Sequence, residues 1–188
     1  MIFVSIPADR RDAALDLMAD HVLREGLAAA TLRPLAAAAG TSDRMLLYYF
    51  ADKDELLTAI LDRIATRLVR ELDAAIPIGS PCSFAVLLKQ VWTILGSKSH
   101  RPYMNIWLDL ASGAARGLQP HRNVAGAIAD GYLTWVTGRL EPRLDGAPAV
   151  SAPLFLAAIE GLYLLNAIGR PAIAQAGMVE LLAIVSAA

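Results

Sequence analysis

Glycine and proline residues divide this chain of 188 residues into short segments, and nearly every segment has a helical pattern. Leucine and alanine, which favour helices, dominate the segments. No stretch alternates apolar and polar residues over the length of a strand. We therefore expect an all-α protein of about nine helices. They would cover residues 10–25, 32–39, 42–50, 53–75, 82–96, 102–117, 121–140, 152–169 and 171–187.

The composition is unusually apolar and almost neutral. Apolar residues make up 56% of the chain, charged residues make up 19%, and the net charge is −1. Such a composition excludes a disordered chain, and a single cysteine, Cys82, excludes a disulfide scaffold. No basic excess supplies a general attraction to nucleic-acid phosphates. Charge is concentrated before residue 76, and residues 145–188 are the most apolar part.

The apolar excess does not predict a membrane protein. Residues 1–7 are apolar but lack the basic start and the length of a signal peptide. The most weakly charged stretches, 144–159 and 171–188, fall short of the roughly 20 clean apolar residues that a spanning helix needs. We expect a soluble cytoplasmic protein without a membrane partner.

Residues 31–57 have the layout of a helix-turn-helix module, with short helices, a tight turn and then a long helix. Ala36 is small enough for two helices to cross closely, and Gly40 tolerates the positive φ that the turn needs. Ser42 is the expected N-cap of the second helix of the pair. Asp52 and Glu55 resemble a capping box at the start of the long helix. The alternative is a four-helix module that has an aromatic patch in its core and does not bind DNA.

The flanking residues narrow the interpretation. In order they are Gly26, Thr31, Ala39-Gly40-Thr41-Ser42, Tyr48-Tyr49-Phe50, and Lys53-Asp54 followed by Leu56. This order resembles the DNA-binding domain of the TetR family of bacterial transcriptional regulators over roughly residues 10–60. The resemblance implies a homodimer that binds a palindromic double-stranded DNA operator, with residues 42–50 in the major groove.

The resemblance also implies which residues contact DNA. Thr31 and Arg33 would contact phosphates, Tyr48 and Tyr49 would present hydroxyls to phosphates, and Lys53 would clamp a phosphate beside a helix N-terminus. The groove-facing start of the second helix would hold residues 42–45. The full expected set is Thr31, Arg33, Thr41, Ser42, Asp43, Arg44, Met45, Tyr48, Tyr49 and Lys53.

Three positions depart from the family pattern. Leu47 stands where the first aromatic residue of the run is usual, so one phosphate contact is expected to be missing. Arg44 stands where glycine is frequent, and its guanidinium could read guanine O6 and N7. Asp43 either accepts a hydrogen bond from cytosine N4 or only favours the helix N-terminus.

The resemblance divides the chain into a DNA-binding domain, 1–56, and an effector-binding and dimerisation domain, 57–188, linked by the helix from about residue 53. The last two helices of the second domain would pair with those of a second copy of the chain. The apolar character of these helices agrees with such an interface. A small, hydrophobic effector would bind among aromatic and polar residues, and the further polar candidates are Thr93, Asn105, Asp109 and Asp130. The expected set is Trp92, Tyr103, Trp107, Tyr132, Trp135 and Glu160. For any single aromatic residue, a core position is the alternative.

No catalytic, metal or cofactor site is expected. Cys82 lies near a helix start, where a thiol can be acidified, but a cysteine with no histidine nearby in sequence is usually structural. His21, His100 and His121 lack the spacing of metal ligands. The resemblance implies a ligand-released repressor. The alternative is a non-catalytic helical carrier or sensor of hydrophobic ligands with weak or lost DNA binding.

Overall fold

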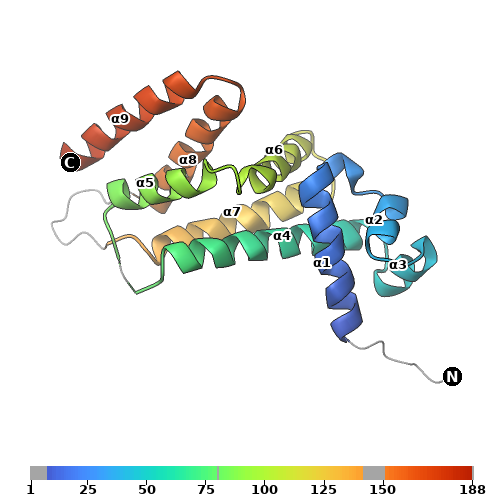
Figure 1. Cartoon of the computed structure of the whole chain (residues 1–188). Helices are drawn as coiled ribbons and strands as arrows, with labels where there is room; N and C mark the ends of the chain where they lie inside the picture. Colours follow the sequence, from blue (N-terminus) through green and yellow to red (C-terminus); the bar gives the residue numbers. More distant parts are fainter. Residues whose placement is uncertain (1–7, 80, 142–150, 188) are drawn as a thin grey trace. The chain divides into compact units, whose positions relative to one another are not determined.

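The computed structural model describes residues 8–79, 81–141 and 151–187, and over this part the chain is all-helical (Figure 1). This confirms the predicted fold class. The elements are α1 (Ala8–Glu25), the 3₁₀ turn η1 (Leu27–Ala29), α2 (Leu32–Ala38), α3 (Asp43–Tyr49), α4 (Lys53–Ala75), α5 (Phe84–Leu95), α6 (Arg101–Ala115), α7 (His121–Thr137), α8 (Ala152–Ala167) and α9 (Pro171–Ala187).

Six of the helices end one to three residues earlier than the sequence predicts, and α7 and α8 show the local structure that follows such an end. Helix α7 ends at Thr137, after which Cys82 and Leu140 form an isolated bridge between two extended segments. Helix α8 ends at Ala167 because Gly169 adopts a φ of 77° and the Arg170 N–H donates to the Leu165 carbonyl at 2.8 Å. A left-handed glycine just after a helix is a common way to satisfy its last carbonyls.

The described residues fall into two compact units. The first unit comprises Met1–Arg70 with Arg101–Ile128, and the second comprises Glu71–His100 with Ala129–Ala188. These units reflect contact density within the chain. The division after residue 56, between DNA-binding and dimerisation domains, concerns function and stays a prediction.

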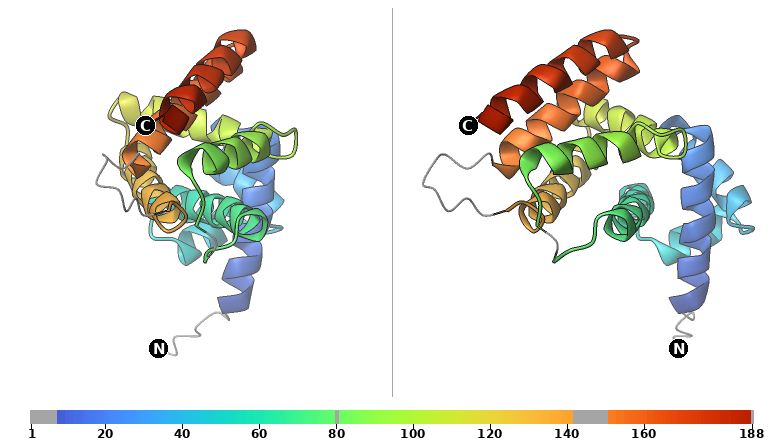
Figure 2. Two further views of the ribbon diagram at one scale, coloured as in Figure 1. Left: turned by 90° about the vertical axis from the view of Figure 1, so that its left-hand side faces the viewer. Right: turned by 60° about the vertical axis from the view of Figure 1, so that its left-hand side comes forward.

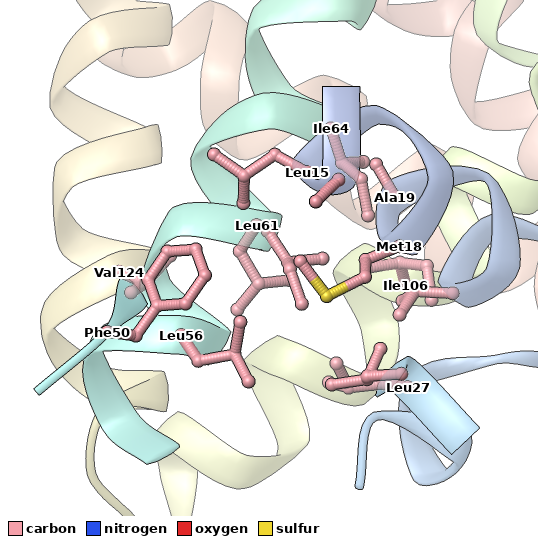
Figure 3. Packing of buried hydrophobic residues seen from close by; sticks show 14 of the residues in the cluster. Leu15, Met18, Ala19, Leu27, Phe50, Leu56, Leu61, Ile64, Ile106 and Val124 are labelled. Atoms are coloured by element: carbon pink, nitrogen blue, oxygen red, sulfur yellow. The ribbon is translucent and has the colours of Figure 1, made fainter. Parts of the chain in front are cut away.

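The first unit has a continuous apolar core (Figure 3). Helix α1 contributes a stripe of buried side chains, in which Met18, Ala19 and Val22 are fully inaccessible to solvent. Helix α4 faces this stripe with apolar side chains of its own, and α6 and α7 complete the core with Ile106 and Val124. The α4 contribution is Leu56, Ile60, Leu61 and Ile64.

Helix α3 joins the same core through one side only. Leu46 is 0% exposed and Phe50, which follows the helix, is 1% exposed, whereas Leu47 is 46% exposed. Two neighbouring leucines thus have opposite environments. Because successive helical residues are separated by 100° around the axis, only one of the two can face the core.

The second unit is built from α5, α8, α9 and the end of α7. Helices α8 and α9 run side by side as an antiparallel pair, which is visible in both views of Figure 2. Phe84 of α5 meets Phe155 of α8 edge to face, with ring centroids 5.4 Å apart. Ile159 and Leu162 of α8 and Met178 of α9 are also buried.

A buried arginine ties the end of α4 to the end of α7 within this unit. Arg139 is 4% exposed, its Nε donates to the Ile76 carbonyl at 2.8 Å, and its guanidinium lies 3.9 Å from the centre of the Trp135 ring. Asp73 accepts from both Arg139 Nη2, at 2.5 Å, and Trp135 Nε1, at 2.8 Å. The buried charge is therefore paired and hydrogen-bonded, as a charge inside a protein must be.

The adjacent leucines of α3 provide a test of this packing. We expect Leu46→Ala to lower the free energy of unfolding by about 2–5 kcal/mol, because it leaves a cavity in the core. We expect Leu47→Ala to change it by less than about 0.5 kcal/mol. Urea denaturation followed by circular dichroism measures both. Equal effects of the two substitutions would contradict the burial described here.

Candidate DNA-binding site

The turn between α2 and α3 has the geometry that the sequence predicts. Gly40 has a φ of 63°, its N–H donates to the Ala37 carbonyl at 3.2 Å, and the N–H of Thr41 donates to the Ala36 carbonyl at 2.9 Å. This pair of bonds is the Schellman arrangement, which ends a helix on a left-handed residue. Ala36 is 2% exposed, so the small residue does lie at the crossing.

Ser42 starts helix α3 as predicted. Its hydroxyl accepts a hydrogen bond from the Met45 N–H at 3.3 Å. Asp43 follows in the first turn, where the helix dipole favours an acid. The cap and the turn together determine how the remaining residues of α3 are presented.

Most side chains of α3 are exposed. Tyr48 is 63% exposed, Tyr49 is half-buried, and the rings of the two tyrosines lie edge to face with centroids 6.3 Å apart. Because Tyr49 is half-buried, only part of its side chain can contact a partner. The exposed residues of α3 are Asp43, Arg44, Met45, Leu47 and Tyr48.

Helix α4 begins with the predicted acidic cap in a modified form. Asp52 accepts from the Glu55 N–H at 2.8 Å, and the Glu55 carboxylate reaches back to the N–H of Ala51 at 2.6 Å. The usual capping box would return to the cap residue itself. Lys53 is the first residue of α4 and is exposed, so its ammonium is available beside the N–H groups of the helix start.

The two residues predicted near the start of α2 are also exposed. Thr31 is the N-cap position of α2, but its side chain makes no capping hydrogen bond. Arg33 lies two residues after Thr31 and is also exposed. The structure thus places Thr31, Arg33, Ser42, Arg44 and Lys53 within the first unit with their polar groups open to solvent.

A set of ion pairs that the sequence analysis missed joins α1 to α4. Asp16 of α1 accepts from Arg67 Nη2 at 2.7 Å and from Arg63 Nη1 at 3.1 Å. Arg63 also pairs with Asp12 at 2.9 Å, and Arg67 also pairs with Asp20. The Arg67 hydrogen bond, together with the charge of Arg63, holds the pKa of Asp16 below its usual value. We call these five side chains the α1–α4 ladder.

Arg11, which precedes Asp12 on α1, makes further contacts beside the ladder. Its guanidinium lies 4.6 Å from the centre of the Phe50 ring and 3.7 Å from the Glu55 carboxylate. An arginine over an aromatic ring contributes through the ring's negative face. The residue that closes α3 and the residue that caps α4 are therefore both attached to α1.

The predicted effector residues are divided between the two units. Tyr103 and Trp107 of α6 are partly buried and pack against the core of the first unit. The second unit holds the other members of the set, Trp92, Tyr132, Trp135 and Glu160.

Within the second unit, Tyr132 stacks on Trp135 with ring centroids 5.7 Å apart and an interplanar angle of 3°. The Tyr132 hydroxyl is buried and makes no hydrogen bond. Burial, together with the charge of Glu160, raises the pKa of Tyr132. The Trp135 N–H is already bonded to Asp73, so the polar atom left unsatisfied at this stack is the tyrosine oxygen.

An open hollow of about 320 Å³ lies elsewhere in the second unit, between the end of α4 and one side of α5. Thr93 is part of its lining, whereas the six residues predicted to bind the effector are not. The lining consists of Ala75, Ile76, Lys89, Gln90, Thr93 and Ile94.

The environment of Cys82 corrects one expectation. Helix α5 begins at Phe84, so Cys82 lies before the N-cap Ser83. Burial raises the pKa of the Cys82 thiol, and the charge of Glu141 adds to this effect. The thiol is therefore less acidic than a free cysteine, rather than acidified by the helix start.

Two further searches cover the described residues only. No group of three or more histidine, cysteine, aspartate or glutamate side chains there is arranged to hold a metal ion. None of the helices in that part combines the length and the apolar character that crossing a bilayer requires.

Comparison with known proteins places this geometry in context. Residues 11–60 match the family described as bacterial regulatory proteins, tetR family. This confirms the resemblance on which the predicted site rests, over almost the same residues. No curated protein matches the chain.

Solved structures match over nearly the whole chain. The multidrug binding protein EbrR complexed with imidazole is 22% identical, with 95% of this chain and 90% of that chain covered and a TM-score of 0.69. A TetR-family transcriptional regulator from Cytophaga hutchinsonii is 16% identical over 97% and 98%, with a TM-score of 0.72. A TetR-family member from Streptomyces coelicolor is 23% identical over 94% and 98%, with a TM-score of 0.66. The chain therefore has the fold of TetR-family transcriptional regulators.

The turn can be tested through its backbone alone. A Cβ added at Gly40 would meet no atom within 4 Å, so any cost of Gly40→Ala comes from the left-handed conformation. We expect Gly40→Ala to lower the free energy of unfolding by about 1–2 kcal/mol. We expect Gly40→Asn to cost less, because asparagine tolerates this region better than alanine does. Thermal unfolding of the two variants measures the difference, and an unaffected alanine variant would contradict the assigned φ.

Proposed function

We propose that this chain, with its TetR-type helix-turn-helix domain, is a homodimeric transcriptional repressor that binds a palindromic operator and is released by a small apolar ligand. The observation that carries the proposal is the rigid turn and caps around α3, which leave one side of that helix in the core and the other in solvent. An α-helix presented in this way fits the major groove of B-DNA.

The proposed contacts divide into base readers and phosphate contacts. Arg44, exposed on α3, would donate to guanine O6 and N7. Asp43 would either accept from cytosine N4 or act only on the helix dipole. Phosphates would be held by side chains around the rim of the site, which positions the helix without reading sequence. The rim comprises Thr31, Arg33, Thr41, Tyr48, Tyr49 and Lys53, and Ser42 and Met45 would lie at the groove.

The nearly neutral charge of the chain bears on how such binding would work. With 17 basic and 18 acidic residues, no bulk attraction to DNA is available. Affinity would therefore depend on a few placed cations and on engaging two half-sites at once. A dimer joins two weak contacts into one stronger one by raising the effective concentration of the second.

The second unit offers a surface for that dimer. One side of α8 has exposed residues at helical spacing, and among them Ala157 and Gly161 are small enough for close approach of another helix. Arg170 and Glu180 are exposed, and Glu160 is half-buried, so little charge opposes apolar contact over residues 151–187. We infer that a second copy of the chain covers this surface. The stripe on α8 is Leu154, Ala157, Gly161, Leu164 and Ile168, and α9 adds Ile173, Val179 and Ile184.

A small effector completes the proposal. EbrR, which shares the fold, has been solved with imidazole, proflavin and ethidium, all small ring compounds. In this chain the buried Tyr132 hydroxyl makes no hydrogen bond, so a ligand that reached the Tyr132–Trp135 stack would meet one unsatisfied hydrogen-bonding group among apolar neighbours. Ligand pockets are commonly built in this way. Binding would shift the dimer between a conformation that fits DNA and one that does not.

Binding-site selection from random duplex DNA tests the DNA-binding proposal directly. We expect a palindromic site with two chains bound per duplex. Arg44→Ala should relax the preference at one base pair of each half-site, at a cost of about 1–3 kcal/mol per contact. Lys53→Ala should weaken all sites alike and reduce the salt slope by about 1 per half-site.

Lys98→Ala is a suitable control, because this exposed lysine lies between α5 and α6 in the other unit, outside both the proposed DNA site and the proposed dimer surface. It should leave the selected sequence and the salt slope unchanged. If the wild-type chain selects no sequence at any salt concentration, the DNA-binding proposal fails and the carrier alternative gains support.

The dimer proposal has its own test at Gly161. A Cβ at this position meets no atom within 4 Å, so Gly161→Arg should leave the single chain folded. At the proposed interface it would bury an unpaired charge, and we expect the dimer to weaken by about 100-fold or more. Analytical ultracentrifugation measures the change. Gly126→Arg on α7, where the space is equally open, is the matched control; a dimer unaffected by Gly161→Arg would contradict the interface.

A further inference from the structure

We propose that Leu47 reads the 5-methyl group of a thymine in each half-site of the operator. This inference rests on the proposed DNA binding and adds a base-specific contact to it. Leu47 is a departure from the family pattern, and it replaces an aromatic residue with one that has no hydrogen-bonding group. Its contribution to binding must therefore be apolar.

The first support is the exposure of Leu47. The side chain is 46% exposed, although α3 has only seven residues and its neighbour Leu46 is fully buried. Leu47 does not belong to the apolar core cluster of the first unit or to the partly buried residues packed against it. Single exposed leucines are common on protein surfaces, but Leu47 shares this short helix with two further exposed large apolar side chains, Met45 and Tyr48. A cluster of exposed apolar side chains is typical of an interaction surface.

The second support is the position of Leu47 relative to its neighbours on the helix. Arg44 lies three positions before it and Asp43 four positions before it, so all three share one side of α3. Tyr48, which is 63% exposed, borders the same side. Leu47 therefore shares the side of α3 that holds Arg44, the proposed base reader, and a leucine at this position cannot make the phosphate hydrogen bond that an aromatic hydroxyl would make.

The third support is the chemistry of the groove. Each base pair presents hydrogen-bond donors and acceptors there, and the 5-methyl group of thymine is its one apolar feature. A leucine in that position has no other favourable base contact. It would also exclude water from the methyl group, and burying one methyl group changes an equilibrium constant about fourfold.

The geometry also restricts where the thymine lies. Leu47 is three residues beyond Arg44, which is a rise of about 4.5 Å along the helix axis. Successive bases of one strand rise about 3.4 Å. The thymine should therefore fall one or two base pairs from the guanine that Arg44 would read.

The test uses the duplex selected by the wild-type chain. Each thymine of the half-site is replaced in turn by deoxyuridine, which removes only the 5-methyl group, and the dissociation constant is measured at fixed salt. We expect one thymine in each half-site at which this exchange weakens wild-type binding about fourfold. With Leu47→Ala, the same exchange should have no effect. Leu47→Met keeps an apolar side chain of similar length and should keep the preference.

Leu17→Ala serves as the matched control. Leu17 is 48% exposed, nearly the same as Leu47, but lies on α1. This variant should retain the full preference for thymine over uracil. If the Leu47→Ala variant loses as much as the wild type on the exchange, or if no thymine shows a methyl effect, Leu47 does not read thymine. If no duplex is selected by the wild-type chain, the proposed function itself has failed.

Discussion

A helix of seven residues cannot keep its shape in water by itself, since isolated helices shorter than about 12–15 residues are marginal at best. Helix α3 has that length, so it depends on the rest of the first unit for its shape. Leu46 and Phe50 anchor it in the core, while the Gly40 turn and the Ser42 cap define where it begins. The side of α3 that faces solvent is therefore determined by the side that does not.

The core that anchors α3 is itself held between α1 and α4 by two different forces. One is apolar packing, in which Met18 and the α4 residues share the core, and the other is the set of ion pairs of the α1–α4 ladder. The lowered pKa of Asp16 means that the ladder contributes stability above the usual pKa of an aspartate, near 4, and loses it as pH falls through the lowered value. At neutral pH the contribution is fully present.

The features that sequence could predict are the local ones. The Gly40 turn, the Ser42 cap and the Asp52–Glu55 cap each involve residues within five positions of one another, so chemistry and spacing are enough to identify them. The ladder and the Arg139–Asp73 pair join residues 47 to 66 positions apart. A spacing of four residues puts Asp12, Asp16 and Asp20 on one side of a helix, but pairing that side with α4 requires knowledge of how the helices pack. Trp135 shows the same limit, because nothing in its local sequence indicates that Asp73 would take its N–H.

The exposed side of α3 has a further meaning for how such a protein could change its target. Asp43, Arg44, Leu47 and Tyr48 are all exposed, and exposed residues without special contacts contribute little to stability. Target recognition would thus be separable from folding, and altered specificities would need no compensating changes in the core. The same module could be redirected to a new operator by exchanging four side chains, which makes it a suitable starting point for engineered regulators that do not interfere with one another.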